Sequence, residues 1–519
     1  MPISHGDQLF GLVQSLTKAE KRNFRLYARR IQGESDAKFM QLFDLLEKQK
    51  EFHEEALLRK MKGASKSQFS NLKRHLYQHI LTSLRLLEMG KREEIQVREW
   101  MDYADILYGK GLYLQALKLL SKAKTLAISM NHDLLHLEIV EFEKRIESRH
   151  ITRSTTERME GLTEEAQKRS QINATIVELS NFKLILQRRF INFGHVKSAG
   201  DRQAAERFFQ DHFPSIRQSK PTFFEEVYLC QVYYWQHYLL GEYARCLEFA
   251  QQWVRLYDRD ARMIDPDVDM YLIGLNHLLV SSFSLRDYEV FLDTLTRLET
   301  FRSGQYARLN YNSKILSFLA VHQGRYNLHF LEGSFQEGLK LIPRTLRRLK
   351  IYEGRLDPHK VLILYYKIAW MYMGAGQPGS AIDYLNKILN APGKSLREDL
   401  QAYTQLLFIM AHYDLGNFDM LDYRIQNTAR FISQMKESSK LQKEAILFFR
   451  ALLSAPPSAR LALFEGFGAQ LAEYRNDPYE QRAFIFLDLP AWVDAKIQDL
   501  PLAAVVAQRF TCRQQFAGK

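Results

Sequence analysis

The chain has 519 residues, of which 46% are hydrophobic and 25% charged, so it has apolar material for several domains or one long helical array. Aromatic residues make up 12%, and no Pro, Gln/Asn or Gly/Ser tract occurs, which excludes a disordered or low-complexity protein. The net charge is +12, and this excess favours acidic partners such as nucleic acid or anionic peptides.

The cysteines and the apolar runs bear on compartment. Cys230, Cys246 and Cys512 are odd in number and scattered, which fits neither a disulfide framework nor a CxxC metal site. The first residues lack a basic leader followed by an apolar run, and no uninterrupted apolar stretch reaches the roughly 18 residues of a membrane span. We therefore expect a soluble, cytoplasmic protein without a membrane span.

Residues 1–97 are predicted to form a basic helical N-terminal region, with 18 Lys and Arg against 12 Asp and Glu. Apolar residues recur at helical spacing from Leu9 to Ile31, which predicts an amphipathic helix. The basic residues around this apolar set are Lys21, Arg22, Arg25, Arg29 and Arg30. We interpret them as a solvated helix face, with a small basic contact surface as the alternative.

A short helix ending near Met61, a turn containing Gly63 and a following long helix have the outline of a helix-turn-helix. Ser65 and Gln68 form an S-x-x-Q capping box that begins the long helix. Its own core would be Leu58, Ala64, Phe69 and Leu72. The candidate nucleic-acid contacts, projecting outward, are Lys66, Gln68, Asn71, Lys73 and Arg74. Any two helices joined by a short turn share this outline, so we expect a structural helical cap, with DNA binding as the alternative.

Two stretches predict helical hairpins by their order of small and bulky residues. The first runs from Trp100 to Ala123 and turns at Gly111; the second runs from Tyr365 to Pro392 and turns at Gly376. Small residues where the two helices meet let them approach closely, and a turn glycine supplies an unhindered link. In the two stretches these small residues are Ala104, Ala116, Ala369 and Ala381.

Further hairpin turns are expected between these stretches and beyond them. In the C-terminal half the turns recur at Gly241, Arg286, Gly333, Gly376 and Gly416, with spacings of 40 to 47 residues. Between about residues 130 and 220 the pattern fades, so we expect divergent repeats there, with residues 150–161 as a loop. Gly200 and Ala205 keep the spacing of a turn and its following small residue.

This pattern resembles the tetratricopeptide (TPR) repeat. The resemblance implies an all-α, right-handed superhelical solenoid of antiparallel TPR-like helical hairpins, about eight to eleven of them, although the spacing here exceeds the usual 34 residues. The repeats would occupy residues 98–454. Residues 455–519, which Pro490 and Pro501 interrupt, are expected to form a C-terminal helical cap over the last hydrophobic face.

The resemblance also implies a binding surface, because four positions of each first helix line the concave face of such a solenoid. They are Tyr228, Gln231, Trp235, Tyr238, Gln323, Asn327, Phe330, Tyr366, Trp370, Met373, Tyr403, Leu406, Met410 and Tyr413. This aromatic and Met-rich wall is either a groove for an apolar peptide or amphipathic helix, or a set of side chains that tightly wound repeats bury against one another.

No motif predicts catalysis. A GxGxxG string at Gly374, Gly376 and Gly379 follows a helix instead of the strand that a dinucleotide site needs. The i, i+4 histidine pairs lack a third metal ligand. They are His75 with His79 and His132 with His136. We therefore expect a non-enzymatic scaffold or adaptor that binds a protein or peptide partner, with no cofactor or metal. The alternative is a transcriptional regulator with an N-terminal helix-turn-helix and a repeat domain that senses a ligand or partner.

Overall fold

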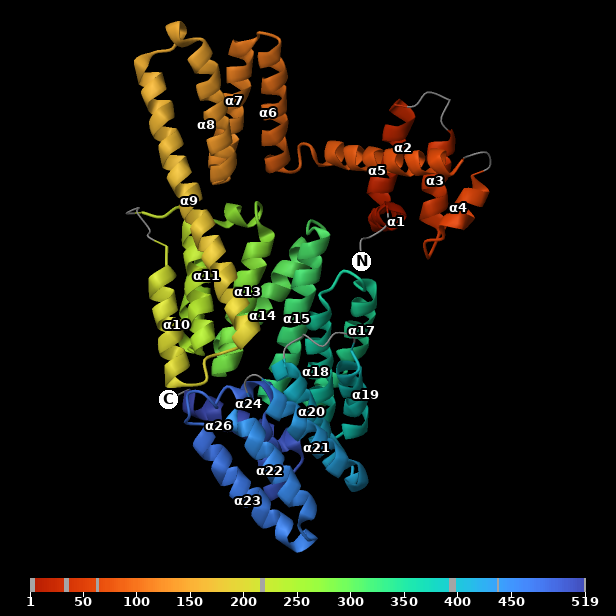
Figure 1. Cartoon of the computed structure of the whole chain (residues 1–519), viewed down its shortest axis with the longest axis vertical. Helices are drawn as coiled ribbons and strands as arrows, with labels where there is room; N and C mark the ends of the chain where they lie inside the picture. Colours follow the sequence, from red (N-terminus) through yellow and green to blue (C-terminus); the bar gives the residue numbers. More distant parts are fainter. Residues whose placement is uncertain are drawn as a thin grey trace. The chain divides into compact units, whose positions relative to one another are not determined.

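The computed structural model describes residues 5–31, 37–61, 65–214, 220–391, 398–435 and 438–517. All regular structure in these ranges is helical. The chain forms two compact units, Met1–Gln171 and Ile172–Lys519, which Figure 1 shows coloured along the sequence. The division falls within helix α9 (Thr156–Phe193) and not at residue 97, where the composition changes.

The first five helices form a bundle with its own core. They are α1 (His5–Ser15), α2 (Lys18–Ile31), α3 (Ala37–Lys48), α4 (Glu54–Lys60) and α5 (Lys66–Glu88). Helix α5 packs on α1, α2 and α3 around buried phenylalanines that include Phe24, Phe43 and Phe69. The segment from Leu9 to Ile31 is two helices and not one.

A capping pair that the sequence pattern hides produces this break. The Thr17 hydroxyl accepts the Glu20 N–H at 3.2 Å, and the Glu20 carboxylate accepts the Thr17 N–H at 2.6 Å. This reciprocal pair satisfies amide groups at the start of α2, so a new helix begins there. The predicted Ser65–Gln68 capping box is confirmed, with hydrogen bonds of 3.0 and 3.2 Å. Gly63 and Ala64 lie outside the described residues.

The rest of the first unit contains α6 (Glu93–Gly109), α7 (Tyr113–Ser129), α8 (Asp133–Arg149) and the beginning of α9. The predicted hairpin of α6 and α7 is confirmed: Ala104 and Ala116 are fully buried where the two helices meet, and Gly111 has a φ of +79°. The predicted loop at 150–161 is only a short 3-10 turn, Ile151–Arg153, before α9 begins at Thr156. Without a proline or a capping signal to stop it, α9 continues for 38 residues.

The second unit is built mainly from antiparallel helix pairs that follow one another along the chain. Helix α10 (Ala199–His212) precedes them, and Gly200 lies inside this helix, so the hairpin turn expected there is absent. The pairs are α11 (Phe223–Leu240) with α12 (Tyr243–Arg259), α13 (Val268–Leu285) with α14 (Tyr288–Gln305), α15 (Tyr311–Glu332) with α16 (Phe335–Leu339) and α17 (Ile342–Ile351), α18 (Pro358–Gly374) with α19 (Pro378–Leu389), and α20 (Glu398–Asp414) with α21 (Phe418–Gln434).

The turn residues expected in this unit are confirmed by their backbone conformation. Each has a positive φ: +75° at Gly241, +57° at Arg286, +75° at Gly333, +72° at Gly376 and +72° at Gly416. This left-handed conformation ends a helix and suits glycine, which lacks the Cβ that would clash. The pattern of small residues holds as well, because Ala369 and Ala381 are fully buried. Pro392 lies outside the described residues.

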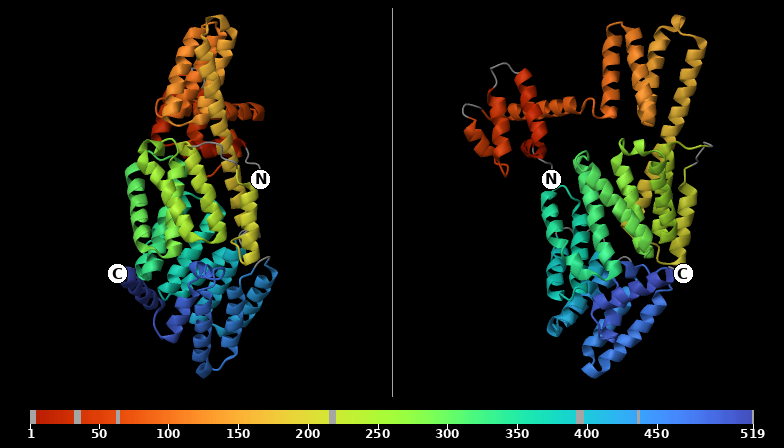
Figure 2. Two further views of the ribbon diagram at one scale, coloured as in Figure 1. Left: turned by 90° about the vertical axis from the view of Figure 1, so that its left-hand side faces the viewer. Right: turned by 180° about the vertical axis from the view of Figure 1, so that it is seen from behind.

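The last helices of the chain turn back along the second unit (Figures 1 and 2). They are α22 (Lys440–Ser454), α23 (Pro457–Tyr474), α24 (Ala483–Phe486), α25 (Leu489–Ile497) and α26 (Leu502–Ala517). Helix α26 packs on α15 and α18. The main chain of α26 lies so close to Gly333 that a Cβ added to this glycine would be only 2.7 Å from the Ala507 nitrogen. The C-terminal segment therefore reaches earlier helix pairs, beyond the last pair that a solenoid cap would cover.

Helix α13 is the one described helix that is long and apolar enough to cross a membrane by length and composition. It packs between α12, α14 and α15, and 44% of its apolar window is buried inside the unit. These contacts make α13 a packed helix of the second unit.

Candidate functional site

The C-terminal segment covers part of the predicted binding wall. The Tyr366 hydroxyl donates a 3.0 Å hydrogen bond to the carbonyl of Phe486, and the Phe486 ring stacks on Tyr403 with centroids 5.4 Å apart. Trp492 meets Tyr413 edge to face at 5.8 Å and is itself only 1% exposed. On α18 and α20, the wall is thus a packed core shared with residues 486–492.

Burial divides the predicted wall into two groups. The buried members are Gln231, Asn327, Tyr366, Trp370, Met373, Tyr403, Leu406 and Met410. The half-buried members are Tyr228, Trp235, Tyr238, Gln323, Phe330 and Tyr413. For the buried group, the alternative in which the repeats bury these side chains against one another holds. Their assignment to an open binding surface is wrong. For Tyr366 and Tyr403 the reason is the covering segment, whose destination no local pattern in the sequence indicates. Gln231 and Asn327 have partners on neighbouring helices, Met270 and Lys367.

Three aromatic residues of α11 keep part of their surface open to solvent. Tyr228, Trp235 and Tyr238 are half-buried. The rings of Trp235 and Tyr238 both contact Phe190 of α9, and the ammonium of Lys183 lies 5.2 Å from the Tyr228 ring centroid. We call Tyr228, Trp235 and Tyr238 the α11 wall.

Titratable side chains lie beside several members of the predicted wall. Trp235 contacts the ring of His277, and burial together with the charges of Lys360 and Lys183 lowers the pKa of His277 to about 3. Burial also lowers the pKa of Lys367 to about 8. The Lys367 ammonium donates to the Asn327 side chain at 2.5 Å. Charges of both signs lie near Tyr228, because the charge of Asp267 acts on Lys183 and on Tyr228. Lys367 lies beside Asn327 and Phe330, in another part of the predicted wall.

The candidate nucleic-acid contacts also differ in burial: four are exposed and one is buried. Lys66, Gln68, Asn71 and Arg74 are exposed on the first turns of α5. Lys73 is only 8% exposed; its ammonium is 2.5 Å from the Glu54 carboxylate of α4 and 5.1 Å from the Phe69 ring. Its predicted outward orientation is wrong, because position 73 follows Phe69 by one helical turn and faces α4.

The basic residues of α2 also meet acidic partners. Lys21 and Arg25 form ion pairs with Glu47 of α3, at 3.3 and 2.5 Å. Arg22, Arg29 and Arg30 are exposed, as a solvated face requires. The pairs within the bundle reduce the positive charge that α2 could offer to a ligand.

The histidine pairs do not form metal sites. His132 caps α8 by accepting the Leu135 N–H at 3.3 Å, whereas His136 is 2.5 Å from Glu165 of α9. His79 meets the Phe39 ring edge to face. In the described residues, no group of three His, Cys, Asp or Glu side chains has the geometry to hold a metal ion.

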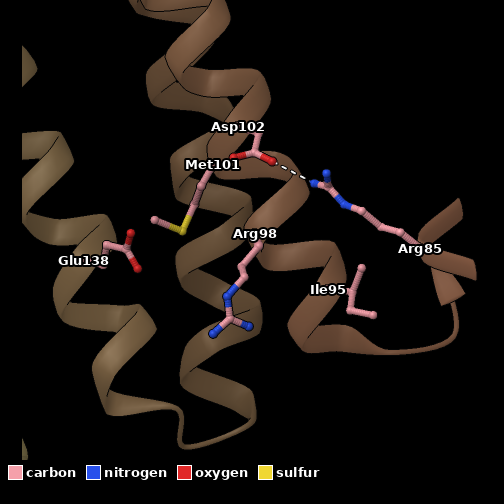
Figure 3. Close-up of a pocket in the computed structure, with 6 residues that line it drawn as sticks. All are labelled: Arg85, Ile95, Arg98, Met101, Asp102 and Glu138. Carbon is pink, nitrogen blue, oxygen red and sulfur yellow. Dashed lines mark hydrogen bonds and ion pairs between the residues drawn. The ribbon is translucent and has the colours of Figure 1, made fainter. Parts of the chain in front are cut away.

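A shallow hollow in the first unit is lined by two arginines that already have carboxylate partners. Figure 3 shows its lining residues, Arg85, Ile95, Arg98, Met101, Asp102 and Glu138. The Arg85 guanidinium pairs with Asp102 at 2.8 Å, and the Arg98 guanidinium pairs with Glu94 at 2.5 Å. These pairs leave the hollow with little capacity to select a ligand.

A larger pocket, of about 640 Å³, lies in the second unit. It is formed where the C-terminal segment meets the turns after α11 and α13. Its polar lining contains seven arginines and two carboxylates: Arg202, Arg245, Arg286, Arg475, Arg482, Arg509, Arg513, Glu242 and Asp488. We call it the arginine pocket. No sequence pattern indicates this pocket, because its arginines are spread over more than 300 residues and follow no motif.

Asp488 lies among the arginines of this pocket. It accepts from Arg286 at 3.2 Å and from Arg509 at 3.4 Å, and it caps α25 by accepting the Ala491 N–H at 3.1 Å. Burial alone would raise the pKa of Asp488, but the two guanidinium charges and the hydrogen bonds outweigh it and lower the pKa. Asp488 is therefore ionised and joins the turn after α13 to the C-terminal segment.

No family model, curated protein or solved structure matches this chain.

Proposed function

We propose that the protein is a non-enzymatic, TPR-like helical-repeat protein of the cytoplasm that binds a protein segment at the α11 wall. The observation that supports this most is the contrast in burial along the predicted wall: Trp370 is only 6% exposed, whereas Trp235 is half-buried. A right-handed superhelical path of the helix pairs belongs to the same proposal.

The chemistry of the α11 wall suggests what it would bind. Aromatic side chains provide large contact areas with few rotatable bonds, which suits an apolar segment or the apolar face of a helix. Lys183 lies against Tyr228, so an acidic residue beside the apolar ones would gain a favourable charge interaction. We propose an acidic, amphipathic segment of another protein as the partner.

Affinity capture followed by mass spectrometry tests this proposal, with and without nuclease. We expect Trp235→Ala to lose partners that survive nuclease treatment. Tyr423→Ala is the matched control, because Tyr423 is 63% exposed on α21, the second helix of its pair. Partners that Trp235→Ala retains, with helical content unchanged by circular dichroism, would refute the assignment to the α11 wall.

A nucleic-acid-binding regulator is the second candidate, because four of the candidate contacts do lie exposed together at the start of α5. Arg74 and Lys66 would then neutralise phosphates. Fluorescence anisotropy of the whole chain with duplex DNA at low salt tests this candidate. Arg74→Gln should weaken binding and reduce the salt dependence by about one phosphate contact, whereas Lys73→Gln should not. Absence of DNA binding at low salt would exclude it.

A further inference from the structure

The arginine pocket carries a positive charge that the protein does not neutralise. Four of its arginines pair with carboxylates: Arg202 with Glu242 and Glu206, Arg245 with Glu248, Arg286 with Asp488, and Arg509 with Asp488 and Asp494. These four arginines and five carboxylates leave one negative charge. The guanidinium groups of Arg475, Arg482 and Arg513 form no ion pair within the part of the chain that the structure describes. The seven arginines therefore exceed the five carboxylates that pair with them by two charges.

Arg482 is the deepest of these three arginines. It is only 5% exposed, and its Nη2 donates to the carbonyl oxygens of Val196 and Tyr479. Its Nη1 is buried without a hydrogen-bond partner. A buried charged donor without an acceptor is costly, and Arg482 lines the pocket, so its charge adds to the attraction for an anion there.

The turn after α11 provides the space that Arg482 occupies. Gly241 lines the same pocket, and a Cβ at this position would be 2.7 Å from Arg482 Nη1. Its φ of +75° also favours glycine. The turn and the buried guanidinium therefore pack closely against each other, which holds the Arg482 side chain in place beside the pocket.

The other two unpaired arginines lie toward the outside of the pocket. Burial and the charge of Arg509 lower the pKa of Arg475, and burial and the charge of Arg286 lower the pKa of Arg513 to about 10. Both guanidinium groups remain charged at neutral pH. Their mutual repulsion would be relieved by an anion held between them and Arg482.

The rest of the lining is apolar and limits the kind of anion. Leu240, Leu285, Phe484, Ile485 and Pro478 line the same pocket. A volume of about 640 Å³ is within the range of small-molecule sites and exceeds what a bare inorganic ion needs. The ligand therefore combines an apolar body with a group that has about two negative charges.

We propose that the arginine pocket binds a small organic phosphate monoester. A phosphate monoester carries about −1.5 to −2 charges at pH 7, which equals the surplus of the pocket, and its oxygens accept the forked hydrogen bonds that guanidinium groups donate. This site is separate from the α11 wall and would give the protein a small-molecule ligand in addition to a protein partner.

Isothermal titration calorimetry of the whole chain at pH 7.5 tests the proposal with three probes. Methyl phosphate presents the dianion, dimethyl phosphate presents only a monoanion, and phenyl phosphate adds an apolar body to the dianion. We expect methyl phosphate to bind at least tenfold more tightly than dimethyl phosphate, and phenyl phosphate to bind more tightly than methyl phosphate. Failure of methyl and phenyl phosphate to bind, or equal affinity for the mono- and dianion, would overturn it.

Variants locate the binding in the pocket. Arg513→Gln removes an exposed guanidinium and should weaken methyl phosphate binding about tenfold, as expected for the loss of one charge-assisted hydrogen bond. Arg347→Gln removes the same charge from an exposed position on α17 and should leave the affinity unchanged. Arg482→Lys keeps the charge but loses the fork; if this variant is unstable, Arg475→Gln replaces it. Equal affinity in Arg513→Gln, Arg475→Gln and the wild type would overturn the assignment.

Discussion

Replacing Gly333 by alanine should weaken the packing of α26 on the turn at this residue. The added methyl group would lie 2.7 Å from the Ala507 nitrogen and 2.8 Å from the Ala503 oxygen. Both are main-chain atoms of a helix, so neither can rotate away as a flexible side chain would. Gly376→Ala is a matched control, because its φ is +72° and no atom lies within 4 Å of the added methyl group.

Both variants pay the cost of a left-handed alanine, but only Gly333→Ala also makes a close contact with α26. A left-handed alanine costs about 1–2 kcal/mol in either turn. At Gly333 the contact with α26 adds about 1–3 kcal/mol, the usual cost of overpacking. Moving α26 away to avoid the contact would expose Leu502, Val505 and Val506, which are all buried, at roughly 1.5–3 kcal/mol each. The variants should therefore differ by about 1–3 kcal/mol.

Hydrogen exchange with mass spectrometry measures this difference locally, because amides report the free energy of opening of their own segment. Peptides from residues 502–517 should exchange about five- to 150-fold faster in Gly333→Ala than in Gly376→Ala, given that 1.4 kcal/mol is tenfold. Equal exchange in these peptides for both variants and the wild type would refute the packing of α26 on this turn.

Three further substitutions test the packing of both units. His322 is 2% exposed, and burial lowers its pKa to about 3. The contribution of this lowered pKa to stability is present above pH 6.5 and is lost as the pH falls, by about 1.4 kcal/mol per pH unit between 6.5 and 3. His322→Gln should therefore flatten the pH dependence of urea unfolding. Thr17→Ala should destabilise the N-terminal bundle by about 1 kcal/mol. Thr82→Ala, on the exposed face of α5, should change the stability of the bundle little. Equal urea midpoints for the two variants would contradict the capping pair. Trp492→Ala removes a buried ring and its 3.1 Å hydrogen bond to Asp414. It should lower the free energy of unfolding by about 3–5 kcal/mol and increase proteolysis after residue 482. An unchanged protease pattern would contradict the packing of Trp492.

Local signals in the sequence predicted the hairpins well. A turn glycine such as Gly376, a small residue such as Ala369 at the helix crossing, and a capping residue such as Ser65 act within a few residues of each other. The helix turns and crossings that these residues produce can therefore be predicted from their spacing along the sequence. The same reasoning missed the T-x-x-E pair at Thr17, although its spacing is of the same kind, because the apolar residues on either side continue at helical spacing.

Long-range packing could not be predicted in this way. The contact between Tyr366 and Phe486 joins residues 120 positions apart, and the bond from Arg482 to Val196 joins residues 286 positions apart. No periodicity specifies such pairs. The helix propensity of residues 455–517 was visible, but the place where this segment packs depends on the shape of the whole second unit. The arginine pocket depends on the same packing, so it was equally hidden.

Photo-crosslinking tests the proposed α11 wall most directly. A benzophenone amino acid replaces Tyr228 in one variant and Tyr423 in another, and each is irradiated with the captured partner. We predict crosslinks from position 228 that an excess of unlabelled wild-type chain suppresses, and none from position 423. Partner crosslinks from position 423 without crosslinks from position 228 would contradict the proposed binding surface.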